Sequence, residues 1–115
     1  MISKVNDLEV YQLAKKLYPK VINLVRNFSP IAFHLRDQIC RAANSISANI
    51  AEGFGRSIVE FKAYLTRSIG SENELKSHFE DALAINEISR KQFLEITREI
   101  DLLGKKLYTL RKNWQ

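Results

Sequence analysis

The chain has 115 residues, of which 45% are hydrophobic and 27% are charged, a balance typical of one globular domain over residues 1–115. Only 4 glycines and 2 prolines occur, which is too few for the many turns of a β-sandwich or barrel, so an all-α fold is expected. The formal net charge of +5 permits a polyanionic partner without requiring one.

Apolar residues recur at helical spacing in four segments. The predicted helices cover residues 8–28, 31–53, 58–86 and 90–113. In the first of them, Asp7 is the expected N-cap, and Pro19 predicts a kink within the helix and not its end. Short connections force neighbouring helices to run antiparallel, so the sequence predicts an up-down-up-down four-helix bundle.

Two later helix starts carry the same sequence signal. Ser57 and Glu60, and again Ser89 and Gln92, have the spacing of a capping box, in which each side chain satisfies one free backbone amide of the first turn. These pairs predict sharp starts for the third and fourth helices.

The first predicted helix carries a second apolar row beside its core row. This row consists of Tyr11, Tyr18, Ile22 and Val25. It makes the apolar surface wider than one bundle core requires, which indicates either a subunit interface or a helix deeply embedded in a small monomer.

Charge is distributed unevenly along the chain. The first and fourth predicted helices are basic and the third is acidic, and the terminal helices of an up-down bundle are neighbours. A candidate nucleic-acid-binding surface therefore consists of Lys15, Lys16, Arg98, Lys105, Lys106, Arg111 and Lys112. The alternative is an ordinary solvated face.

Catalytic and metal-binding patterns are weak. His34 and His78 fall in different helices, and Glu74 lies four residues before His78 without enough further ligands for a metal. Cys40 is the only cysteine, which excludes an intrachain disulfide. We therefore expect no enzymatic activity, no metal and no cofactor, and the absence of a signal-like or membrane-spanning segment predicts a cytoplasmic protein without a membrane partner.

Two polar rows stand out on the middle helices. The second helix carries Arg41, Ser45, Glu52 and Arg56, with Asn49 at the boundary, and the third carries Arg67, Ser71, Glu74 and His78. Gly70 lies in the middle of the third helix. A glycine within a helix usually permits close backbone approach. The rows are either solvent-exposed faces or surfaces that pair across an interface.

Glu72 is anomalous because it lies within the apolar stripe of the third helix, where an unpaired carboxylate is costly. We expect either an Arg or Lys partner or a water-filled gap beside it.

Three segments carry a family resemblance. They are Leu8-Glu-Val-Tyr, Arg41-Ala-Ala-Asn-Ser-Ile-Ser-Ala-Asn-Ile-Ala-Glu-Gly-Phe-Gly-Arg56, and Gly70-Ser-Glu-Asn-Glu-Leu75. With them the chain resembles the bacterial four-helix-bundle proteins often encoded in intervening sequences of 23S ribosomal RNA genes, and is similar to the accessory protein of diversity-generating retroelements. The resemblance implies a ring-shaped homopentamer with a central channel and no enzyme activity.

The marked positions of that family fall on the two polar rows. They correspond here to Arg41, Ser45, Asn49, Glu52, Gly53, Arg56, Gly70, Ser71 and Glu74. The chain departs from the family pattern at Ser68-Ile69, where alanine is usual at the first position, and at Glu72, where a small or apolar residue is more common.

Two functions remain open. The first is a non-enzymatic homo-oligomer that binds RNA or DNA through basic surfaces with little sequence specificity. The alternative is a scaffold that binds an acidic or nucleic-acid-handling protein.

Overall fold

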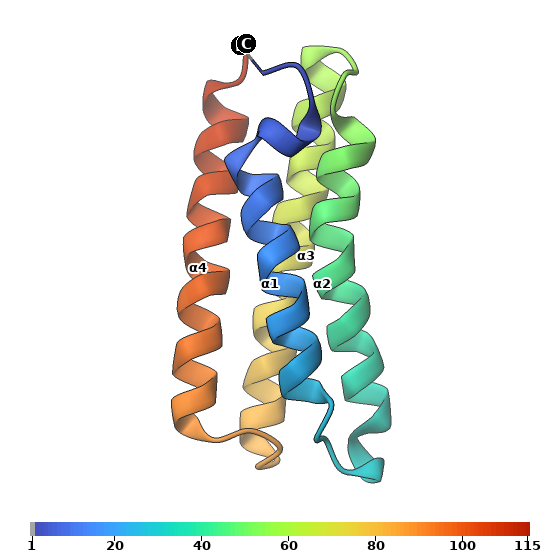
Figure 1. The fold of residues 1–115 in the computed structure, drawn as a ribbon, viewed down its shortest axis with the longest axis vertical. Coiled ribbons are helices and arrows are strands. Elements are labelled where there is room, and N and C mark those ends of the chain that lie inside the picture. Colours follow the sequence, from blue (N-terminus) through green and yellow to red (C-terminus); the bar gives the residue numbers. More distant parts are fainter. Residues whose placement is uncertain (1) are drawn as a thin grey trace.

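The computed structural model describes residues 2–115 and consists of four long antiparallel helices (Figure 1). They span Glu9–Val25 (α1), Phe33–Gly53 (α2), Ile58–Ala84 (α3) and Arg90–Asn113 (α4), with short 3₁₀ turns at Val5–Asp7 (η1) and Pro30–Ala32 (η2). Residues 2–115 contain no strand. The predicted all-α fold and its up-down-up-down order are therefore confirmed.

The first helix differs most from its predicted bounds. It ends at Val25 and not at residue 28, although Phe28 still reaches the core through a turn in which its N–H donates to the Val25 carbonyl (3.0 Å). Asp7 is not the N-cap, because η1 intervenes and the Asp7 carboxylate accepts from the backbone N–H of Lys4 (3.2 Å). As predicted, α1 continues through Pro19.

The N-caps of α3 and α4 follow the sequence signal. Ser89 Oγ accepts from the Gln92 N–H (3.1 Å) while Gln92 Oε1 accepts from the Ser89 N–H (2.9 Å), which completes the predicted capping box. At α3, Ser57 Oγ accepts from the Glu60 N–H (3.2 Å), and the Glu60 carboxylate accepts from the Ser57 hydroxyl (2.9 Å). The serine caps are thus confirmed at both helices, but the reciprocal bond forms in the expected way only at α4.

Each helix packs against two neighbours, and the α2–α3 contact is the most extensive while the α1–α4 contact is the least. Small residues bring α2 and α3 together. A Cβ on Gly53 would lie 2.8 Å from Cγ of Tyr64, and the buried Ser68 hydroxyl donates to the Ile46 carbonyl (2.9 Å). The α2–α3 contact is therefore too close to admit larger side chains at these points.

The additional apolar row of α1 is largely covered within the single chain. Val25 is only 2% exposed and belongs to the core, and Tyr11 and Tyr18 are half-buried against it. The reason is that α1 packs against both α2 and α4, so two of its faces are enclosed. Packing within the single chain therefore accounts for much of this row, while Tyr11, Tyr18 and Ile22 stay partly exposed.

Contacts between distant segments stabilise both ends of the bundle, through aromatic packing at one end and hydrogen bonds at the other. Where α2 leads to α3, Trp114 lies beyond the end of α4 with its ring centroid 4.9 Å from that of Phe61 and 6.4 Å from that of Phe54. At the opposite end, the Glu87 carboxylate accepts from both the backbone N–H and the hydroxyl of Ser29 (2.6 Å each). This pair joins the α1–α2 connection to the α3–α4 connection.

Candidate functional site

The seven predicted basic residues lie on α1 and α4, which are neighbours as expected. Two of them contact residues on different helices. Lys106 Nζ lies 3.1 Å from Glu9 Oε1 on α1, whereas Arg111 Nη1 donates to Thr66 Oγ1 on α3 (3.1 Å).

A more regular basic surface runs along α4. Lys91, Arg98, Lys105 and Lys112, which we call the basic stripe, are spaced seven residues apart and are all exposed. Seven residues are close to two helical turns, so these side chains project from one side of the helix. None of the four forms an ion pair with any residue in 2–115. The sequence analysis did not include Lys91, although the seven-residue spacing of Arg98, Lys105 and Lys112 points to it.

Two exposed leucines accompany the basic stripe. Leu94 is 48% exposed and Leu102 is 49% exposed. Leu102 also lines two hollows between α1 and α4, one of about 510 Å³ that includes Lys105 and Lys106 and one of about 180 Å³ that includes Lys16. The α1–α4 groove, as we call this surface, therefore combines apolar and cationic side chains.

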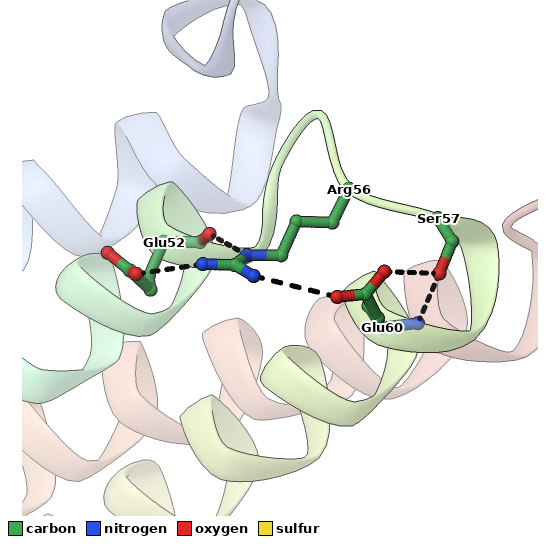
Figure 2. Close-up of polar contacts among 4 residues, drawn as sticks. All are labelled: Glu52, Arg56, Ser57 and Glu60. Carbon is green, nitrogen blue, oxygen red and sulfur yellow. Dashed lines mark hydrogen bonds and ion pairs between the residues drawn. The ribbon is translucent and has the colours of Figure 1, made fainter.

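The polar row predicted for the second helix continues past the end of α2, because Arg56 lies in the connection between α2 and α3. The Arg56 guanidinium lies between two carboxylates, with Nη2 3.0 Å from Glu52 Oε1 and Nη1 3.5 Å from Glu60 Oε2 (Figure 2). Its Nε donates to the Glu52 carbonyl near the end of α2 (2.8 Å), where a cation satisfies free helix carbonyls. Arg56 thus joins the last turn of α2 to the first turn of α3.

Tyr64 links the two rows further along the pair. Its ring centroid lies 5.1 Å from the Arg56 guanidinium carbon and 4.5 Å from that of Arg67. Nearby, the Asn49 side chain donates to the Ser45 carbonyl (2.9 Å), a bond within α2. In the single chain, these family positions have contacts that organise α2 and α3.

The Gly70 region behaves differently. No atom lies within 4 Å of the place where a Gly70 Cβ would be, so the close approach expected there does not occur within this chain. Ser71 is half-buried, Glu74 is exposed with Oε1 3.6 Å from His78 Nε2, and Arg41 pairs with Asp37 of its own helix (3.0 Å). This part of the α2–α3 surface remains open.

Glu72 is only 6% exposed and has no hydrogen-bond donor among residues 2–115. The cation nearest in sequence on its side of α3, Lys76, instead bonds to Asp101 Oδ1 of α4 (2.8 Å). Of the two expected arrangements, the structure shows the gap. Glu72 lines a hollow of about 750 Å³ between α3 and α4.

The environment of Glu72 favours its protonated form. Burial, followed by the negative charge of Asp101, raises the pKa of the Glu72 carboxyl from 4.5 to about 7, while Lys76 acts in the opposite direction. The carboxylate is accommodated at Gly104 of α4, where a Cβ would lie 2.7 Å from Glu72 Cδ. The sequence analysis identified the anomalous carboxylate but not the glycine that makes room for it.

Within residues 2–115, no helix is long and apolar enough to span a bilayer, and no three His, Cys, Asp or Glu side chains gather as a metal site.

The sequence and the fold were each compared with known proteins. The sequence model for the 23S rRNA-intervening sequence protein matches residues 6–109. No curated protein matches the sequence significantly. The fold is similar to a crystal structure from Bacteroides thetaiotaomicron, described as a protein with unknown function from the S23 ribosomal protein family, with 24% identity, a TM-score of 0.85, and coverage of 90% of this chain and 99% of that one.

Proposed function

This chain belongs to the 23S rRNA-intervening sequence protein family, and we propose that it acts as a non-enzymatic homo-oligomer that binds nucleic acid through basic surfaces with little sequence specificity. The observation that carries the proposal is the basic stripe of α4, whose four cations are exposed and form no ion pair within residues 2–115. Cations that are not already neutralised remain available for phosphate groups.

The geometry of the basic stripe suits a phosphate backbone. At 1.5 Å per residue, the stripe from Lys91 to Lys112 is about 30 Å long, close to one turn of a nucleic-acid duplex. Lysine and arginine contacts to phosphates release counterions and carry no sequence information. Binding of this kind is weak for one chain and strongly dependent on salt.

Assembly would multiply this weak interaction. Five copies of a chain with a net charge of +5 present several basic stripes to one polyanion, and simultaneous contacts raise the overall affinity. A homopentamer is the assembly that the family resemblance implies. The open surface around Gly70, where no atom of this chain lies within 4 Å of a Cβ position, supports contact with a second copy there.

Binding of fluorescent RNA and DNA as a function of salt tests the proposal. Replacing the four residues of the basic stripe with Gln should weaken binding to all sequences about equally and reduce the salt dependence. The matched control replaces Lys4, Arg26, Arg36 and Lys62 with Gln, which removes the same charge elsewhere. Absence of binding by the wild-type oligomer at about 50 mM salt, or equal losses in the two variants, would overturn the proposal.

A protein-interaction scaffold is the second candidate, and the exposed Leu94 and Leu102 favour it. Apolar side chains within a basic surface suit an acidic protein partner better than a phosphate backbone. Replacing both leucines with Ser should abolish binding of such a partner but leave salt-dependent binding of nucleic acid nearly unchanged. This pair of measurements separates the two functions.

A further inference from the structure

The hollow between α3 and α4 contains a buried acceptor for which residues 2–115 provide no donor. Glu72 is only 6% exposed, and its carboxylate occupies the space beside Gly104. No fully enclosed side-chain oxygen or nitrogen in residues 2–115 lacks a hydrogen bond, so the unbonded Glu72 oxygens keep some exposure, and Glu72 lines the hollow. A ligand in the hollow can therefore donate to them.

The other charged groups of the hollow restrict what that ligand can be. Lys76 and Asp101 neutralise each other at 2.8 Å, which leaves Glu72 as an acceptor and Lys105 as a cation. An alkylammonium ligand would be repelled by Lys105. A ligand with neutral N–H donors beside an anionic group satisfies Glu72 and Lys105 together.

Two further residues connect the hollow to the proposed nucleic-acid surface. Lys105 both lines the hollow and belongs to the basic stripe. Tyr108 also lines the hollow, and its side chain is 56% exposed. Unpaired bases stack on aromatic rings of this kind, and their edges are then read by polar side chains.

We propose that the hollow binds one unpaired guanine, with Glu72 accepting from the base, Tyr108 against its ring, and Lys105 at the adjacent phosphate. This inference rests on the proposed function and adds a base preference to it. Guanine presents two neighbouring donors, N1–H and the N2 amino group, which match the two oxygens of a carboxylate. Adenine and cytosine place a single amino donor beside a ring acceptor, so they cannot form both bonds.

The test uses single-stranded oligouridylates that contain one central guanine, hypoxanthine or adenine, at pH 8, where Glu72 with its pKa of about 7 is ionised. Hypoxanthine lacks the N2 amino group. We expect guanine to increase affinity about tenfold over adenine, with hypoxanthine between them. Glu72→Gln should remove this preference without changing the binding of plain oligouridylate.

Two further variants separate base recognition from folding. Gly104→Ala should also abolish the guanine preference, because the added Cβ displaces the Glu72 carboxylate. Glu95→Gln, an exposed change on α4, is the matched control and should retain it. Equal binding of all three oligonucleotides would overturn the guanine site but leave the proposed function intact.

A last experiment applies if no oligonucleotide binds. Guanosine monophosphate is titrated into the protein, and the backbone amide NMR signals of Gly104 and Lys105 are followed. If no oligonucleotide binds but the mononucleotide shifts these signals, the guanine site holds and the basic stripe does not bind nucleic acid. If neither binds, both proposals fall.

Discussion

The α2–α3 contact and the α1–α4 groove lie on opposite sides of the bundle and are built differently. Close backbone approach at Gly53 and the bond from Ser68 to the Ile46 carbonyl hold α2 and α3 together. Exposed long side chains join α1 to α4, through the pairs Lys20–Glu99 and Lys106–Glu9. Close packing at one side leaves little freedom to change sequence, whereas the loosely joined side can carry binding residues.

This difference also separates two kinds of family position. Gly53 and Arg56 both have structural roles within one chain. Gly53 leaves room for the Tyr64 side chain, and Arg56 connects the end of α2 to the start of α3. Gly70 has no such role within residues 2–115, since no atom lies within 4 Å of the position of its Cβ. Membership of one motif therefore does not give its residues one role.

Gly53→Ala should have the largest effect on the α2–α3 contact. The new Cβ would lie 2.8 Å from Tyr64 Cγ, so the helices must separate, and we expect a loss of about 3 kcal/mol in the free energy of unfolding. Urea denaturation followed by circular dichroism measures this loss. A change below about 1 kcal/mol would show that the contact can relax, in contrast to the close packing of protein interiors.

Glu72→Gln should stabilise the protein at alkaline pH. Because the folded pKa of about 7 exceeds the ordinary 4.5, the folded chain retains a proton that the unfolded chain releases, and stability falls as pH rises from about 4.5 to about 7. At pH 8 the variant should be about 3 kcal/mol more stable than the wild type, and at pH 4 the two should be similar.

The charged groups that act on Glu72 are Asp101 of α4, which strengthens this effect, and Lys76 of its own helix, which opposes it. Glu95→Gln provides a control with the same chemical change at an exposed site. A stability difference between wild type and Glu72→Gln that does not vary with pH would contradict the assignment of the raised pKa.

Gly70→Ala should stabilise an isolated bundle by about 0.5–1 kcal/mol, because alanine favours a helix and nothing lies near its Cβ. Gly70→Trp should leave the isolated fold intact but weaken assembly if a second copy packs on this surface. Sedimentation velocity and urea denaturation on the same samples distinguish the two effects. Unchanged sedimentation of the tryptophan variant would place the subunit contact elsewhere.

The smallest effects are expected at the α1–α4 groove. Lys20→Gln and Lys106→Gln each remove one exposed ion pair, which typically contributes less than about 1 kcal/mol and is weakened by salt. Lys16→Gln, which breaks no ion pair within residues 2–115, is the control. Thermal melts at low and high salt provide the comparison, and a large loss of stability in either variant would show that this side is as tightly built as the other.

The sequence predicted the four helices well because periodicity and serine caps are local signals. The predicted range 90–113 coincides with α4, whose capping box at Ser89 forms as expected. The end of α1 was predicted too late because Phe28 continues the apolar spacing after the backbone has left the helix. At such a turn a residue can be buried without being helical, and apolar spacing alone does not distinguish the two cases.

The candidate site was predicted less well because it depends on contacts between distant residues. The sequence identified Gly70 as a point of close approach and gave Gly104 no role, yet within one chain Gly104 receives the Glu72 carboxylate and Gly70 remains open. Likewise, nothing local shows that Lys106 turns to Glu9 while Lys105 remains unpaired. The register between antiparallel helices decides these pairings, and it follows from the packed core.

The aromatic contact of Trp114 makes the end of α4 visible by spectroscopy. Trp114 is the only tryptophan of the chain, and it packs on Phe61 and Phe54 at the α2–α3 connection. Its fluorescence emission therefore reports whether the last turn of α4 is docked, independently of the helix content measured elsewhere. Fraying of this turn would shift the emission toward longer wavelength before the bundle unfolds, which makes the protein its own optical probe of local opening.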